Sequence, residues 1–209
     1  MPKIVLPGVA AVALAAVSFA NAVPAAGQAL VGRPAPAFTL ADSSGKDRSL
    51  ADFVGKTVVL EWWNPECPFV GKHYGSGNMQ RLQREWTAKG VVWLTINSSA
   101  AGHQGHVDGP KAEEWMRART GAPTAVLLDP AGKVGRAYGA KTTPHMFVID
   151  KAGVLVYEGG IDDRPSTDQA DIAGARNYVV EALAAVSSGR AVPTATTTPY
   201  GCGVKYASR

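Results

Sequence analysis

The stretch "TVVLEWWNPECPFV", residues 57–70, decides the fold, because an apolar run leads into a loop bounded by two prolines. The run from Thr57 to Trp63 is rich in β-branched and aromatic residues and is interrupted only by Glu61. Such a run predicts a buried central strand. Pro68 suits the first position of a helix, where a missing N–H group needs no partner. Cys67 is therefore predicted between the end of a central strand and the start of a helix.

The other elements follow from the same patterns. The runs "VVWLTIN", "TAVLLD", "HMFVID" and "VLVYEG" predict strands over residues 91–97, 124–129, 145–150 and 154–159, the last two forming a hairpin. Helices are predicted over residues 77–90, 110–120, 130–139 and 170–187. This order predicts an α/β fold with a mixed central β-sheet and helices on both faces. In such sheets the chemistry lies where a strand meets the following helix, which is where Cys67 is.

The N-terminus of the 209-residue chain resembles a secretory signal, with one basic residue, an apolar run and a small-residue cleavage site at Ala20-Asn21-Ala22. We expect a signal peptide at 1–22, one folded domain at 23–190 and an irregular tail at 191–209. The protein is then exported, periplasmic or extracellular, without stable membrane insertion; an N-terminal membrane anchor is the alternative. The net charge of +4 is scattered, which excludes a nucleic-acid partner.

Four motifs in order resemble one known superfamily. They are "GRPAPAFTL" (32–40), "NPEC" (64–67), "TTPHMFVID" (142–150) and "GVLVYEGGIDD" (153–163). Together they are similar to the thioredoxin-like superfamily, in its peroxiredoxin-like redoxin branch of the alkyl hydroperoxide reductase and thiol-specific antioxidant type. The resemblance implies a thioredoxin-like fold with Cys67 as the redox-active residue. It also implies that Thr143-Pro144 is the cis-proline dipeptide opposite that cysteine, and that His145 lies beside the thiol.

The sequence departs from both branches of the superfamily near Cys67. Asn64 stands where thioredoxins have their attacking cysteine and where peroxiredoxins have a Thr or Ser. Leu60 replaces an upstream peroxiredoxin proline, and Pro144 takes the place of the activating arginine. With these departures, the resemblance implies a general thiol-disulfide or antioxidant activity in preference to a dedicated, fast peroxidase.

The catalytic residues that we expect are Cys67, Cys202, Asn64, Pro144 and Glu61. A helix N-terminus favours the thiolate of Cys67, and Lys72 and His73 would add positive potential. Glu61 is either a proton carrier or a satisfied polar residue at a strand end. Asn64 either donates its amide to the thiolate or to a bound peroxide, or forms a turn before proline.

Cys202 is the second of the two cysteines and lies in the Gly-flanked tail segment "YGCGVKY". If the tail folds back over the loop at Cys67, Cys202 resolves a Cys67 sulfenic acid to a disulfide, which an external thiol reductant reopens. The same bond could instead be a permanent staple, or join two subunits. The expected substrate is a peroxide or a disulfide, and no cofactor is required. Residues expected to bind the substrate are Trp63, Pro65, Glu66, Thr143 and His145.

Weaker signals support other hypotheses. His103 and His106 form an H-x-x-H pattern, so a non-catalytic thioredoxin-fold binding module with a fixed Cys67–Cys202 disulfide could hold a metal there. A solvated loop explains the same pattern, and a copper-handling protein is a third hypothesis. His145 is either a proton donor or a strand-start residue. The segment "IDDRPS" (161–166) predicts an exposed acidic turn with local pairing of Arg164.

Overall fold

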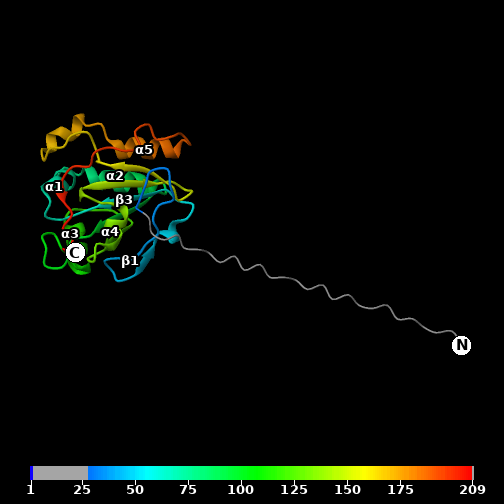
Figure 1. Cartoon of the computed structure of the whole chain (residues 1–209). Helices are drawn as coiled ribbons and strands as arrows, with labels where there is room; N and C mark the ends of the chain where they lie inside the picture. Colours follow the sequence, from blue (N-terminus) through cyan, green and yellow to red (C-terminus); the bar gives the residue numbers. More distant parts are fainter. Residues whose placement is uncertain (2–27, 209) are drawn as a thin grey trace.

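A five-stranded mixed sheet forms the centre of the molecule in the computed structural model, which describes Met1 and residues 28–208 (Figure 1). The predicted signal peptide and its cleavage site lie outside the described residues, apart from Met1. The strands run in the order β5-β4-β3-β7-β8, where β3, β4 and β5 are parallel and β7 and β8 are antiparallel. Their bounds are Val58–Trp62 (β3), Val92–Asn97 (β4), Ala125–Leu128 (β5), His145–Ile149 (β7) and Leu155–Gly159 (β8). The mixed sheet and the hairpin predicted from the sequence are confirmed.

Helices and an N-terminal hairpin cover the sheet. The helices are α1 (Pro68–Gly75), α2 (Asn78–Ala88), α3 (Gly109–Ala118), α4 (Lys133–Tyr138) and α5 (Tyr178–Ser187), with 3-10 turns η1 (Leu50–Phe53) and η2 (Gln169–Gly174). The hairpin pairs β1 (Thr39–Ala41) with β2 (Asp47–Ser49). No helix of the described part is long and apolar enough to span a membrane.

The side chains of alternate β3 residues belong to two different hydrophobic clusters, one on each face of the sheet. Val59 and Trp63 pack with α1, α2 and α5 in the cluster that contains Cys67. Leu60 and Trp62 pack with α4 and the N-terminal segment in the other cluster. Because side chains alternate along a strand, burial of both sets requires the continuous apolar run that the sequence shows.

The last helix begins later than residue 170, where the sequence predicted it. Residues 169–174 form the 3-10 turn η2, and α5 begins only at Tyr178. The Asn177 side chain accepts a hydrogen bond from the Val180 N–H and so caps the new helix. The prediction missed this local cap, which divides the segment into two elements.

The C-terminal tail returns across the molecule from α5 past the start of α1, as the red trace in Figure 1 shows. The sequence predicted an irregular tail, yet β9 (Cys202–Gly203) pairs antiparallel with β6 (Thr142–Thr143). Further backbone hydrogen bonds join Val204 to Lys141 and Ala100 to Lys205. The tail is therefore also held directly after the short strand pair, a feature that depends on contacts far apart in the sequence.

Candidate active site

Cys67 occupies the N-cap position of α1, directly after the loop that leaves β3. Its backbone is extended (φ −81°, ψ 122°), and Pro68 follows as the first helical residue. The Cys67 N–H donates to the Asn64 carbonyl, which closes the turn through Pro65. Only 1% of the Cys67 residue is exposed to solvent. The strand-loop-helix sequence thus places a buried thiol at a helix N-terminus, where partial positive charge gathers.

The cis-proline segment and the tail enclose the Cys67 thiol. The Thr143–Pro144 peptide bond is cis, and the Thr143 carbonyl lies 2.9 Å from Cys67 Sγ, within hydrogen-bond reach of the thiol. Cys202 is the residue paired with Thr143 across the β6–β9 pair. Gly201 precedes it with a φ of 133°, and a side chain there would collide with the Thr143 carbonyl. The tail therefore folds back and brings the second cysteine to the first.

The two thiols differ in pKa because their surroundings differ. Burial raises the pKa of Cys67, but hydrogen bonds from the Cys202 thiol, the Thr143 hydroxyl and the N–H groups of Val70 and Cys202 outweigh it, so the Cys67 pKa is lowered. The Cys202 pKa is raised to about 11, by burial and by its hydrogen bond and charge contact with Cys67, against a smaller opposing effect of Lys205. Both cysteines are free thiols in this structure. Cys67 is thus the more acidic thiol of the pair, and Cys202 is the less acidic one.

Asn64 shapes the loop and does not donate to the thiol. Its Oδ1 accepts from the Glu66 N–H at 2.8 Å, and its Nδ2 donates to the Gln104 side chain at 3.3 Å. The glycine at 105 lies so close that a Cβ there would overlap the Asn64 amide. The turn-forming alternative is therefore the one that the structure displays.

Glu61 lies fully buried in a closed hydrogen-bond network. Its Oε1 accepts from the Tyr74 hydroxyl, and its Oε2 accepts from Gln83, Trp93 and Thr95 at 2.8–3.2 Å. Burial raises the Glu61 pKa, and the four hydrogen bonds offset that rise only in part. The network ties β3 and β4 to α1 and α2, which is the satisfied-polar alternative rather than a link to the thiol.

These features can now be compared with known proteins. Residues 31–158 match the model of the AhpC/TSA family. The chain belongs to the AhpC/TSA family. A thiol-disulfide oxidoreductase ResA from Geobacillus thermodenitrificans is 32% identical over 124 residues, which cover 59% of this chain and 65% of that protein. The matched segment thus spans somewhat less than two thirds of this relative.

Solved structures support the same fold. A hypothetical protein from Sinorhizobium meliloti superposes with a TM-score of 0.73 at 26% identity, covering 86% of this chain and 96% of that one. A putative thiol:disulfide interchange protein DsbE from Chlorobium tepidum superposes with a TM-score of 0.51 at 27% identity, covering 63% of this chain and 85% of that one. The fold is thus thioredoxin-like, in a family that includes thiol-disulfide oxidoreductases.

Two histidines that were expected to act on Cys67, His73 and His145, do not have the surroundings that such a role needs. His145 contacts the Phe147 ring on the opposite face of the sheet, and its Nδ1 accepts the Lys141 N–H. Burial, and then the nearby Lys141 charge, lower the His145 pKa to about 3. The His73 pKa falls to about 4, mainly through burial, so this residue adds no positive potential at neutral pH. Neither imidazole is protonated where a proton donor to the thiol would be needed.

The remaining expected site residues lie around the loop. Trp63 is 1% exposed and packs edge-on against Trp115, so it supports the loop from within the core. Pro65 and Glu66 line a groove of about 450 Å³ together with His106 and Trp115. Neither Cys67 nor Cys202 lines this groove, so it flanks the loop without reaching the thiols.

The metal site of the alternative hypothesis has no ligand set among residues 28–208, where no group of three or more His, Cys, Asp or Glu side chains could hold an ion. His103 is exposed, and His106 Nδ1 lies 3.0 Å from the Ser99 carbonyl.

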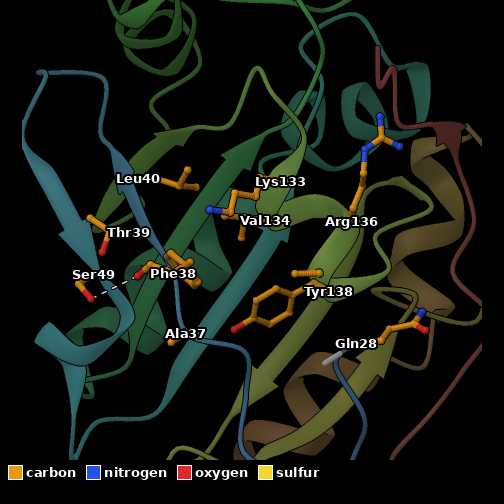
Figure 2. Close-up of a pocket in the computed structure, with 11 residues that line it drawn as sticks. Gln28, Ala37, Phe38, Thr39, Leu40, Ser49, Lys133, Val134, Arg136 and Tyr138 are labelled. Atoms are coloured by element: carbon orange, nitrogen blue, oxygen red, sulfur yellow. Dashed lines mark hydrogen bonds between the residues drawn. The ribbon is translucent and has the colours of Figure 1, made fainter. Parts of the chain in front are cut away.

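A hollow of about 830 Å³ lies between residues 37–40 and α4, away from the two thiols (Figure 2). Phe38 and Tyr138 line it, and none of the expected site residues does.

Sequence reasoning missed two residues beside the thiols. Asp162 was expected in an exposed turn, but it is 3% exposed and accepts a hydrogen bond from the Tyr200 hydroxyl of the tail. Arg164 does pair locally, with Asp163 at 3.5 Å. A signal was available for Tyr200, since an aromatic residue two positions before a tail cysteine is suited to anchoring it.

Proposed function

We propose that this protein is an exported thiol-disulfide oxidoreductase that cycles between a dithiol and a Cys67–Cys202 disulfide. The observation that carries the proposal is the pairing of Cys202 with Thr143, the residue whose carbonyl lies 2.9 Å from Cys67 Sγ. The family supports redox chemistry, and the signal-like N-terminus supports export. Two thiols of unequal pKa in contact can form and break one bond without rearrangement of the fold.

In the oxidising half-cycle, the Cys67 thiolate attacks one oxygen of a peroxide. The O–O bond breaks, the leaving oxygen takes a proton and departs as an alcohol or water, and Cys67 becomes a sulfenic acid. The Cys202 sulfur then attacks the Cys67 sulfur, water leaves, and the disulfide forms. Because Pro144 stands at the place of the activating arginine, we expect this peroxide step to be slow and exchange with disulfides to be the main activity.

In the other half-cycle, an external thiolate attacks the Cys202 sulfur of the disulfide. Cys202 is partly exposed, whereas Cys67 is 1% exposed, so the incoming sulfur reaches Cys202 first. Cys67 departs as a thiolate, and a leaving thiol of lower pKa leaves faster. A second external thiol then releases Cys202 and completes the two-electron reduction. The reductant is a dithiol protein or two equivalents of a small thiol.

The test is a redox titration of the mature protein in glutathione buffers, with the thiols counted after acid quench. We expect reversible opening and closure of one disulfide, no closure in Cys67→Ser or Cys202→Ser, and loss of both peroxide and disulfide turnover in Cys67→Ser. A disulfide that resists dithiothreitol in the folded protein would support the fixed staple instead. Full turnover in Cys67→Ser would overturn the proposal.

A further inference from the structure

A chain of hydrogen bonds links the tail to helix α1 beside the thiols. The Arg81 guanidinium donates to Asn78 Oδ1 at 2.8 Å, which leaves the Asn78 amide nitrogen facing His73 Nδ1 at 2.9 Å. His73 Nε2 lies 3.2 Å from the Tyr200 hydroxyl, and that hydroxyl donates to the Asp162 carboxylate. Each group in this chain therefore has a donor on one side and an acceptor on the other.

The direction of the chain is fixed by its two ends. The Asn78 amide can only donate to His73 Nδ1, so the neutral imidazole carries its proton on Nε2 and donates to Tyr200. Tyr200 then donates its own proton to the carboxylate of Asp162. A hydrogen bond to a carboxylate in a buried setting is among the stronger kinds. One attachment of the tail, that of Tyr200 to Asp162 and α1, thus depends on a single hydroxyl group.

The ring of Tyr200 also rests on α1. It meets Phe69 edge-on at 5.9 Å between centroids, and Lys72 Nζ lies 5.7 Å from its centre. Lys72 is itself buried, donates to the Arg164 carbonyl at 2.7 Å and lies 4.0 Å from Asp162. Tyr200 therefore contacts the helix whose N-cap is Cys67.

The anchors on the other side of Cys202 reach different parts of the molecule. Tyr206 donates to the Ala140 carbonyl, and Arg136 donates to the Ala207 carbonyl. Neither contact involves α1. Between Tyr200 and Cys202 there is only Gly201, whose backbone runs against Thr143. Tyr200 is therefore the tail side chain two residues before Cys202 that bonds and packs against α1.

We propose that Tyr200 is a positioning residue that holds the Cys202 thiol against Cys67 and so sets how readily the disulfide closes. The inference rests on the proposed function, because it concerns the same pair of cysteines. Tyr200 touches neither the oxidant nor the external thiol, and it acts only through the place of the tail.

The test compares reduced wild-type protein with Tyr200→Phe, which removes both hydrogen bonds and keeps the ring on Phe69. Tyr178→Phe is the matched control, because the Tyr178 hydroxyl has no hydrogen-bond partner among the described residues. After one equivalent of hydrogen peroxide, acid-quenched samples are resolved by intact mass into thiol, sulfenic acid and disulfide. Glutathione equilibria give the effective concentration of Cys202 at Cys67 without any peroxide.

We expect Tyr200→Phe to accumulate sulfenic acid trapped by dimedone, and to lower both the closure rate and the effective concentration about tenfold, the size of one lost hydrogen bond to a charged group. Gly201→Ala keeps the tyrosine but pushes the strand from Thr143, so it should slow closure too. If wild type never closes, the proposed function fails. If wild type closes and Tyr200→Phe closes as readily, the role of Tyr200 is wrong, whatever Gly201→Ala does.

Discussion

Replacing Glu61 with glutamine should remove a pH-dependent cost of folding. The carboxylate accepts one hydrogen bond on Oε1, from Tyr74, and three on Oε2. A glutamine carbonyl can take the place of Oε2, while its amide faces the Tyr74 hydroxyl, which can turn to accept. Glu61→Gln should therefore fold, whereas Glu61→Ala would leave several buried donors unpaired.

The way in which this cost changes with pH follows from the direction of the Glu61 pKa shift. Burial raises the Glu61 pKa in the folded state above its ordinary value of 4.5. Between these two values the unfolded chain has lost the proton and the folded protein keeps it. The free energy of unfolding then falls by about 1.4 kcal/mol for each pH unit. The stabilisation from Glu61 is complete below pH 4.5 and is lost as the pH rises through the raised pKa.

The assay is urea unfolding of the reduced proteins at a series of pH values that rises from the ordinary Glu61 pKa of 4.5, above which this linkage acts. The difference between Glu61→Gln and wild type should grow with that slope and level off at the folded-state pKa. Glu113, which is exposed, provides the control Glu113→Gln, whose curve should follow wild type. Parallel curves for Glu61→Gln and wild type would refute the reasoning, since they would mean that Glu61 titrates alike in both states.

Three further predictions concern the thiols. Cys202→Ala should raise the pKa of Cys67, seen as thiolate absorbance against pH, and Cys202→Ser should raise it less because its hydroxyl still donates; identical titrations would contradict this. Glutathione added to the oxidised protein should form its mixed disulfide on Cys202 rather than on Cys67, as peptide mapping after acid quench will show. His145→Gln should leave the pH profile of disulfide closure unchanged near neutrality, because the His145 pKa of about 3 keeps its imidazole neutral there. If an inflection of the wild-type profile near neutrality is lost in the variant, this prediction is wrong.

Much of the fold could be predicted because its strands are marked by local composition. The β3 run is apolar on both faces, and only a strand covered on both sides accounts for such a pattern. The position of Cys67 followed from the same stretch, since Pro65 bounds the loop and Pro68 suits the first turn of a helix. These signals are contained within a few residues, so one sequence is enough to show them.

The surroundings of the thiol could not be predicted in the same way. The two-residue strand β9 exists only because Thr143 faces it, and no local propensity marks so short a strand. Asp162 was expected in solvent because it stands in an acidic turn, but Lys72 and Tyr200, which lie far from it in the sequence, make its burial possible. Asn64 allowed two interpretations until the partner at Gln104 was known. Each of these features depends on a contact between distant segments.

The tail determines which partners can reach each sulfur. The β6 strand offers its backbone beside Cys67, and an exposed strand edge is where an extended peptide could pair. In this structure the tail itself takes that edge, and Cys67 is 1% exposed beneath it. Under the proposed redox cycle, a protein thiol then meets the partly exposed Cys202 rather than Cys67 as long as the tail stays on β6. The same strand pair would in that case both supply the second thiol and select partners by size.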